Sequence, residues 1–362
     1  MSARRAALIA LLTLASCAGE GPAGGARAES CGECHSAEHE EWSGSRHASG
    51  AATEATSPVF QALLPRVEAV WGSVARARCV GCHTPGFGGD EAIGCVSCHA
   101  AVGNRGAQDG KLVIDLDAPL GASRKSPPTP AHDTEVRGLL TASELCGTCH
   151  DVRGPGLFDE GTFTELQSSP VPGRTCVGCH LRRGDEGRAD HRFIGVDPPW
   201  GAPEVARSRA AEDTRALIAE ALSLRLTGTS GGVEVTLTNV GGGHAVPTGV
   251  SFLRDFWVDL RIVDADGATF DEPRIVELGA RMTLAGSEVA LPTDADTIES
   301  RSLAPEASLR VEVALPAEAA LPVSIEATLR ARAVRASTLA ALGLSERADE
   351  VPELVVAVAR WP

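Results

Sequence analysis

One short pattern occurs five times in this chain and constrains its fold more than any other feature. Cys-x-x-Cys-His stands at residues 31–35, 79–83, 95–99, 146–150 and 176–180. Two cysteines three positions apart lie on the same side of a helical turn. Their thiols can therefore form thioethers with the two vinyl groups of one porphyrin, and the adjacent histidine can bind the iron. The repeated pattern predicts five covalently bound haem c groups.

The motifs define the expected attachment residues. The thioether cysteines are Cys31, Cys34, Cys79, Cys82, Cys95, Cys98, Cys146, Cys149, Cys176 and Cys179, and the proximal iron ligands are His35, His83, His99, His150 and His180. A lone Cys-x-x-Cys could instead be half of a zinc site, a redox motif or part of a disulfide framework. None of these alternatives requires a histidine after every pair, so the five complete motifs favour haem.

The eleventh cysteine, Cys17, stands in a different context. Two arginines and a short apolar run precede it, as in a secretory signal peptide. Leu-Ala-Ser-Cys at 14–17 resembles a bacterial lipobox. We therefore expect residues 1–16 to be removed and Cys17 to carry a lipid anchor on a membrane, facing the periplasm or the cell surface. The alternative is an ordinary signal peptide cleaved nearby. Residues 17–30 would form a flexible tether after the lipidated cysteine.

The charge of the chain limits its partners. The formal net charge is −15, and removal of residues 1–16, which contain two arginines and no acidic residue, would make it −17. Nucleic-acid binding is therefore not expected. A redox protein partner with a basic docking face fits this charge.

Two regions with different patterns meet near residue 200. Residues 31–200 contain all five motifs together with frequent Pro and Gly, which predicts a haem-packed, mainly α and irregular cytochrome domain. Within it, the segment from Ser57 has helical periodicity. The sequence pattern of residues 201–222 predicts a helix that connects the two regions. Residues 223–362 lack cysteine and alternate apolar and polar residues in five runs, with a turn signal at Asp266-Gly267. This pattern predicts an antiparallel β-sandwich of immunoglobulin-like type.

Five histidines remain after the proximal ligands are assigned. They are His39, His47, His132, His191 and His244, and each of the five irons needs a sixth ligand or has an open site. The equal numbers make these histidines candidates for distal ligands. Met282 is the one internal methionine that could serve instead. His244 stands in a glycine-rich run, Asn239–Gly249, where the backbone can approach a haem edge closely.

Several blocks resemble the multihaem cytochromes related to the tetrahaem cytochrome of ammonia oxidisers. These blocks are Trp42-x-x-Ser45-x-His47-Ala48 after the first motif, Ile93–His99, His191–Gly195 and Gly243–Gly249. The resemblance implies an electron-transfer protein with closely stacked, mostly bis-histidine haems, and a β-sandwich in the larger members. It also implies distal ligation by His47, His191 and His244, and less directly by His132.

The chain departs from that family pattern after the third motif. His99 is followed by Ala100–Asn104, and no further histidine occurs before His132. His39 could fill the resulting vacancy on a neighbouring haem, because it lies one helical turn after His35 and cannot reach the opposite face of the same haem. The alternative is an exposed histidine in an acidic run.

Three functions remain open at this point. The first is electron transfer between periplasmic or outer-surface partners through six-coordinate haems. The second is an oxidoreductase in which one five-coordinate haem binds a small nitrogen species such as nitric oxide, hydroxylamine or nitrite. The third is a subunit of a cytochrome filament. Whether all five spare histidines bind iron separates the first function from the second.

Overall fold

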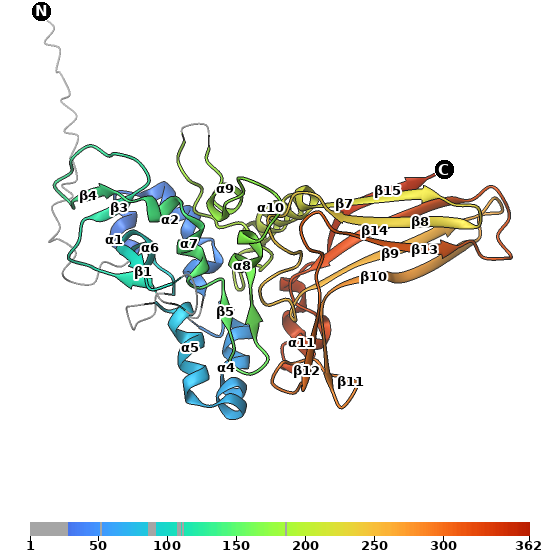
Figure 1. Ribbon diagram of the computed structural model, residues 1–362, viewed down its shortest axis with the longest axis horizontal. Coiled ribbons are helices and arrows are strands. Elements are labelled where there is room, and N and C mark those ends of the chain that lie inside the picture. The colour runs from blue at the N-terminus through green and yellow to red at the C-terminus, as the bar shows by residue number, and fades with distance from the viewer. Residues whose placement is uncertain (1–27, 51–52, 86–91, 107–109, 111, 185–186) are drawn as a thin grey trace, which may run out of the picture.

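The computed structural model describes residues 28–362, apart from 51–52, 86–91, 107–109, 111 and 185–186. A helical and irregular region carries the motifs, and a β-sheet region extends away from it (Figure 1). Between them lies α10 (Glu204–Ala221), the helix expected in residues 201–222. Cys17 and the signal peptide fall outside the described residues. No helix in the described part of the chain is long and apolar enough to cross a membrane.

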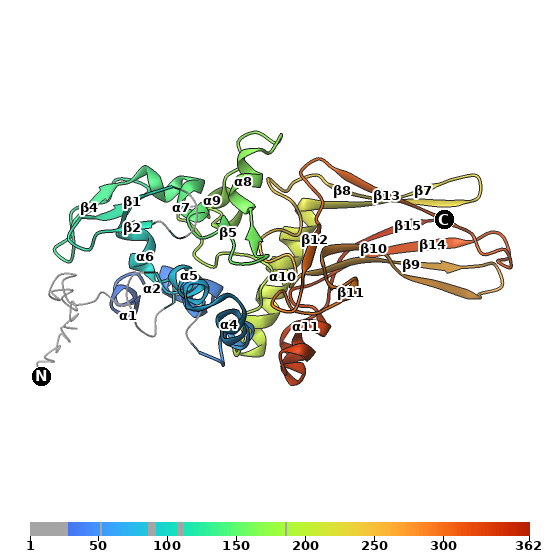
Figure 2. The same ribbon diagram turned by 60° about the horizontal axis from the view of Figure 1, so that its bottom comes forward.

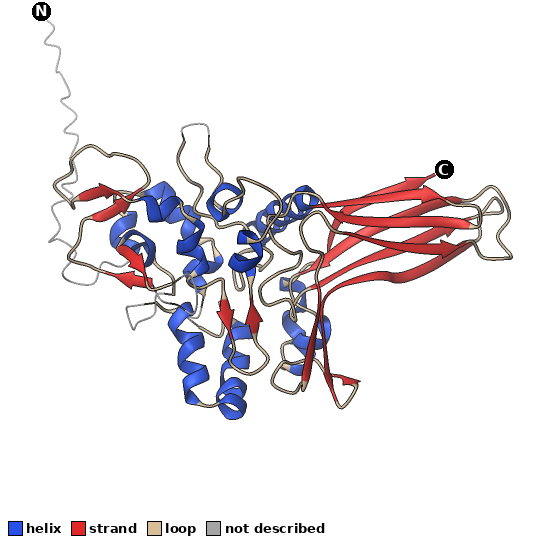
Figure 3. Cartoon of the chain, in the orientation of Figure 1, coloured by secondary structure: helices blue, strands red, loops and turns tan. Residues whose placement is uncertain are grey.

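Short helices dominate the motif region (Figure 3). They are α1 (Ala28–Gly32), α2 (Ser36–Ser43), α3 (Arg46–Ser49), α4 (Pro58–Trp71), α5 (Ser73–His83), α6 (Cys95–His99), η2 (Gly138–Thr141), α7 (Ser143–Gly147), α8 (Thr162–Gln167) and α9 (Cys176–His180). The helical periodicity from Ser57 is confirmed and divides into α4 and α5. Pro58 suits the first turn of α4, and Gly72, with φ of 85°, separates the two helices.

Three small sheets in the motif region were not predicted from the sequence. They are formed by β1 (Ala101–Asn104) with β2 (Leu112–Ile114), β3 (Leu120–Ala122) with β4 (Thr134–Val136), and β5 (Val152–Arg153) with β6 (Asp159–Glu160). Each has strands of two to four residues, too short for a periodic signal to stand out. The β5–β6 hairpin matters for the site because it follows the fourth motif directly.

The β-region consists of two antiparallel sheets that face each other (Figure 2). One sheet has the order β13-β8-β7, and the other has the order β11-β10-β9-β14-β15 with β12 also paired to β10. The strands are β7 (Leu222–Gly228), β8 (Gly232–Asn239), β9 (Asp255–Val263), β10 (Thr269–Leu284), β11 (Ser287–Glu288), β12 (Thr297–Arg301), β13 (Ser308–Ala314), β14 (Ser324–Arg332) and β15 (Leu354–Trp361), with α11 (Ala336–Ala341) and η3 (Ser345–Glu350) before β15.

The alternating residues of these strands form the sandwich core. Val233, Val235 and Leu237 of β8 are fully buried and share one cluster with Leu260 and Ile262 of β9. The period-two pattern therefore identified the inward faces correctly. The turn signal at Asp266-Gly267 is also confirmed, since it lies between β9 and β10 with Gly267 at φ of 80°.

Removal of a core side chain tests the sandwich. Leu260 is 1% exposed, so Leu260→Ala leaves a cavity and should lower the free energy of unfolding by about 2–5 kcal/mol. The neighbouring Arg261→Ala should change it by less than about 1 kcal/mol, because its ion pair with Asp271 is exposed. Urea unfolding followed by far-ultraviolet circular dichroism measures both. Equal midpoints for the two variants would contradict the assigned core.

Candidate haem-binding site

Each Cys-x-x-Cys-His motif is built as a helical turn. The amide N–H of His35 donates to the carbonyl of Cys31 at 2.9 Å, and that of His150 donates to Cys146 at the same distance. The second motif ends α5, while the third and fifth motifs are α6 and α9 themselves. This local structure places the first and second cysteine of each motif on one side, as the spacing predicted.

Four of the five spare histidines face a proximal histidine. The distances between ring centroids are 6.2 Å for His35 with His132, 6.3 Å for His150 with His47, 6.4 Å for His99 with His191 and 6.4 Å for His180 with His244. The rings are inclined to each other by 36°, 59°, 20° and 12° in the same order. The partners come from distant parts of the chain, so the tertiary fold brings each pair together.

These separations match two imidazoles bound to one metal ion. A metal–nitrogen bond of about 2.0–2.1 Å and about 1.1 Å from nitrogen to ring centroid place two opposed rings roughly 6.2–6.4 Å apart. All four pairs fall in that range. Rings packed directly on each other lie closer; Phe60 and His83, for example, stack at 4.0 Å. The described residues therefore fit four bis-histidine irons.

Hydrogen bonds at the other ring nitrogen prepare these histidines to bind metal. Nδ1 faces the backbone carbonyl of Gly50 for His83, of Gly121 for His99 and of Ile194 for His180, and faces the carbonyl of Asp133, Ala189 and Ala245 for His132, His191 and His244. A carbonyl only accepts, so the proton must sit on Nδ1. The lone pair of Nε2 is then free for iron.

Burial keeps several of the rings neutral. Desolvation lowers the pKa of His47 to about 3, and it also lowers the pKa of His83, His99 and His180. A neutral imidazole is the form that binds a metal. In His150, desolvation is the largest single effect and lowers the pKa, but the hydrogen bond to Glu160, the charge of Glu160 and the neighbouring Cys149 and Cys176 together raise the pKa to about 9.

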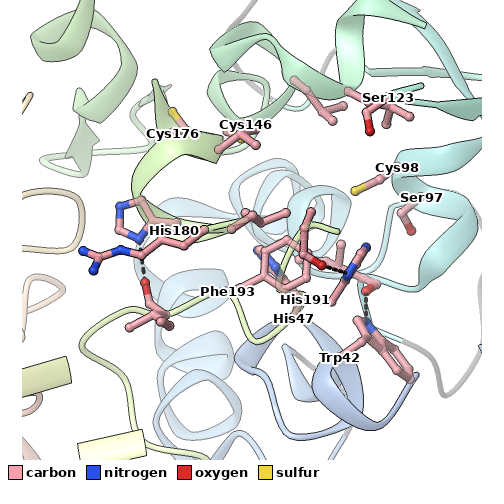
Figure 4. A pocket seen from close by; sticks show the side chains of 18 of the residues that line it. Trp42, His47, Ser97, Cys98, Ser123, Cys146, Cys176, His180, His191 and Phe193 are labelled. Carbon is pink, nitrogen blue, oxygen red and sulfur yellow. Dashed lines mark hydrogen bonds between the residues drawn. The ribbon is translucent and has the colours of Figure 1, made fainter. Parts of the chain in front are cut away.

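A single cavity of about 2380 Å³ contains all four histidine pairs. Residues of the first, third, fourth and fifth motifs line it, and Figure 4 shows Cys98, Cys146, Cys176 and His180 around its interior. The volume exceeds the ~1,000 Å³ upper range of pockets for one drug-sized ligand. The His150 ring is 52% exposed because it faces this cavity. The cavity thus suits several large cofactors in contact.

The attachment cysteines of three motifs lie close together. Cys82 of the second motif lies beside Cys149 of the fourth, and Cys146 of the fourth motif lies beside Cys176 of the fifth. Porphyrins attached at these positions would lie close together. Nine motif cysteines are outside disulfides.

The second motif lacks an opposing histidine. All ten histidines are among the described residues, and no second imidazole ring pairs with His83. Phe60 of α4 stacks on its ring instead, with an angle of 24° between the planes. Met282, the one internal methionine, is 2% exposed in a cluster that joins the β-region to Val59 of α4.

His39 lies apart from the four pairs. Its ring packs against Trp42 at 5.5 Å between centroids, and a Cβ at Gly32 would come within 2.7 Å of it. Its buried Nε2 has no hydrogen-bond partner. His39 lines the same cavity. Among the described residues, no ring contact joins His39 to a proximal histidine, and its role as a ligand stays a prediction.

Polar contacts that the sequence did not reveal hold the distal histidines in place. The Trp42 indole donates to the carbonyl of Ile93 at 2.9 Å, and the Ile93 amide donates to the carbonyl of His47 at 2.9 Å. Glu41 accepts the His191 amide at 3.0 Å while Arg188 binds the same carboxylate. The blocks that carry the resemblance include Trp42, Ile93 and His47, but the sequence did not predict that hydrogen bonds link these three residues.

The loop that carries His244 reaches from the sandwich into the cavity. Buried Asn239 donates to the carbonyl of His244 at 2.9 Å and fixes the loop at the end of β8. Glu165 of α8 accepts the Ala245 amide at 3.1 Å and the Thr248 hydroxyl at 2.6 Å. A Cβ on Gly243 would lie 2.7 Å from Leu166, so the close approach requires glycine there.

Comparisons with known proteins agree with this geometry. The family model described as cytochrome c554 and c-prime matches residues 30–100. No curated protein matches the chain. The crystal structure of a penta-heme cytochrome c552 from Thermochromatium tepidum superposes with a TM-score of 0.71 and 20% sequence identity, over 93% of this chain and 98% of that one. The likeness therefore extends through the sandwich.

Fold and motifs together define a multihaem c-type cytochrome region followed by an antiparallel sheet-rich region. The five motifs, the family match and the penta-haem neighbour support five covalently bound haem c groups. The structure adds that four of the motif histidines each face a second histidine.

Removal of His244 tests the pairing across the two regions. His244→Ala should convert one low-spin haem to high-spin, since the other rings near His180 are not placed to replace the ligand. It should also speed proteolysis near residues 200–232, because the sandwich loses a bond to the motif region. Electron paramagnetic resonance and limited trypsin digestion measure the two effects. His39→Ala is the matched control, and an unchanged spin count in both variants would exclude ligation by His244.

Proposed function

We propose that this protein is an exported pentahaem cytochrome c that transfers electrons between redox protein partners. The observation that carries the proposal is the set of four histidine pairs at 6.2–6.4 Å in one cavity. Bound haem supplies an iron that accepts and releases one electron. Two opposed imidazoles keep the same coordination in both oxidation states, which favours rapid transfer over substrate binding.

The protein's own residues would serve this function in two ways. The Nδ1–H···carbonyl bonds fix each ring so that the ligand does not move when the charge of the iron changes. Cys82 lies beside Cys149, and Cys146 lies beside Cys176, so haems attached at these positions would be near neighbours. Electrons would pass between the haems of the neighbouring motifs. The negative net charge of the chain would attract a redox partner with a basic surface.

A second function, ligand binding or catalysis at one haem, is favoured by the surroundings of His83. This proximal histidine has an aromatic ring, Phe60, beside it and no opposing imidazole. An open sixth position at this iron would admit a small molecule such as nitric oxide, hydroxylamine or nitrite. The protein would then combine one reactive position with four electron-storing ones.

Carbon monoxide distinguishes occupied from open iron positions. The reduced protein, with five haems per chain confirmed by pyridine haemochromogen assay, should bind at most one carbon monoxide per chain. Four iron positions are filled by histidine pairs, so only the His83 position can respond. Optical titration gives the stoichiometry. Two or more bound molecules would contradict the proposed ligation, and turnover of hydroxylamine or nitrite at the single site would establish the second function.

We infer that the sandwich is immunoglobulin-like. Of its seven main strands in chain order, the first, second and fifth form one sheet (β7, β8, β13), and the fourth, third, sixth and seventh form the other (β10, β9, β14, β15). A constant-type immunoglobulin domain differs only in placing the fourth strand on the first sheet. The domain would carry His244 and hold it rigidly.

We further propose that residue 17 anchors the protein to a membrane through lipid. The Leu-Ala-Ser-Cys sequence and the apolar run before it support this proposal. Cys17→Ala should release the protein into the soluble fraction with all five haems retained, because anchoring and haem attachment use different cysteines. Ala18→Ser, outside this block, is the matched control and should stay with the membranes. A Cys17→Ala protein that resists a high-salt wash would exclude the lipid anchor.

A further inference from the structure

His150 differs from three other proximal histidines in its hydrogen-bond partner. Nδ1 of His83, His99 and His180 faces a backbone carbonyl, whereas Nδ1 of His150 lies 2.9 Å from Oε1 of Glu160. The carboxylate carries a full negative charge and accepts a proton more strongly than a carbonyl does. The fourth motif therefore has a ligand environment of its own.

The β5–β6 hairpin positions this carboxylate. The chain leaves His150, runs through β5 and returns in β6, where Glu160 pairs with Val152 in antiparallel register. The Glu160 side chain is 14% exposed, and a Cβ added to Gly249 of the sandwich would lie 3.1 Å from Oε1. The carboxylate is thus enclosed between the imidazole and the sandwich loop, and it cannot readily move away.

The charge of Glu160 is not neutralised by arginine in the described part of the chain. The nearby Arg153 forms ion pairs with Asp159 and with Asp151, and the ion-pair partner of Glu160 is His150 itself. The negative charge of Glu160 therefore acts mainly on the His150 ring. His47, the proposed opposite ligand, has no such carboxylate: its Nδ1 is buried without a hydrogen-bond partner, and its ring lies edge-to-face with Phe193 at 4.3 Å between centroids.

A carboxylate at this position changes the electron donation of the ligand. It draws the Nδ1 proton toward itself, gives the imidazole partial imidazolate character and strengthens its bond to ferric iron. Its negative charge also favours the more positive oxidation state of a nearby iron. Both effects lower a reduction potential, and second-sphere hydrogen bonds are one of the means by which proteins adjust potentials.

On the basis of the proposed bis-histidine ligation, we propose that Glu160 is a positioning residue that gives the haem of the fourth motif the lowest potential of the four histidine-paired haems. Cys149 of this motif lies beside Cys82 of the second motif, and Cys146 lies beside Cys176 of the fifth. The haem position that accepts an electron least readily would thus stand between two others. In the partly reduced protein it would stay oxidised while its neighbours hold electrons, and it would set the energy step for transfer between them.

The first test needs no variant. The His47 and His150 rings are inclined by 59°, more than the 12°, 20° and 36° of the other pairs, so their low-spin iron should give the most anisotropic paramagnetic resonance signal. A redox titration of the complete haem-loaded protein, monitored by this method, should show that signal disappearing last on reduction. Earlier loss of it than of the other paired signals would overturn the proposal.

The second test changes the carboxylate. Glu160→Gln keeps the shape but removes the charge, and it should raise the potential of that one haem while the other potentials stay within error. Asp159→Asn is the matched control, since it removes an acidic charge from the adjacent residue, whose partner is Arg153. Glu160→Asp retains a carboxylate and should leave the potential closer to that of the wild type than Glu160→Gln does.

The outcomes separate this inference from the proposed function. Wild-type protein without bis-histidine signals would refute the ligation on which both rest. Intact signals with an unchanged potential in Glu160→Gln, or an equal shift in Asp159→Asn, would refute the role of Glu160 alone. If Glu160→Gln loses its haem, the order of potentials in the wild type and in Glu160→Asp still decides the question.

Discussion

The opposed imidazole pairs are the constraint on which the motif region depends. Both large clusters of buried apolar side chains centre on the sandwich. The first 150 residues contribute only Val59 and its neighbours in α4 to the second cluster. In the described residues, the motif region has a cavity where a core would otherwise be. Porphyrins fixed by two thioethers and two axial nitrogens would fill that space with apolar surface, and burial of apolar surface is the main driving force of folding.

The same interaction joins the two regions. His180 of α9 and His244 of the sandwich lie at the separation of a metal-bridged pair, and around them Glu165 accepts hydrogen bonds from Ala245 and Thr248. With the proposed ligation, the electron-transfer site would extend across both regions, and the sandwich would be part of the haem-binding structure. The superposition with the penta-haem cytochrome over 93% of the chain agrees with one conserved arrangement of both parts.

The motifs, the helix of residues 204–221 and most sandwich strands could be predicted from the sequence, because their signals are local spacings and periods. Among the longer strands, β7 and β10 were missed. In β10, a register shift between Glu272 and Val276, with Arg274 at φ of 53°, interrupts the alternation. The histidine pairs could not be derived, because partners such as His35 and His132 meet only through tertiary folding. Counting histidines also suggested a fifth pair, whereas His39 packs on Trp42 and His83 on Phe60.

Low-temperature electron paramagnetic resonance of the fully oxidised protein tests the ligation most directly, because it counts low-spin and high-spin ferric haems in the same sample. The arrangement of the histidines predicts four low-spin bis-imidazole haems per chain, one of them strongly anisotropic, and a fifth haem with a separate signature that reflects the missing partner of His83. Fewer than four low-spin bis-imidazole signals in protein with five haems attached would contradict the account.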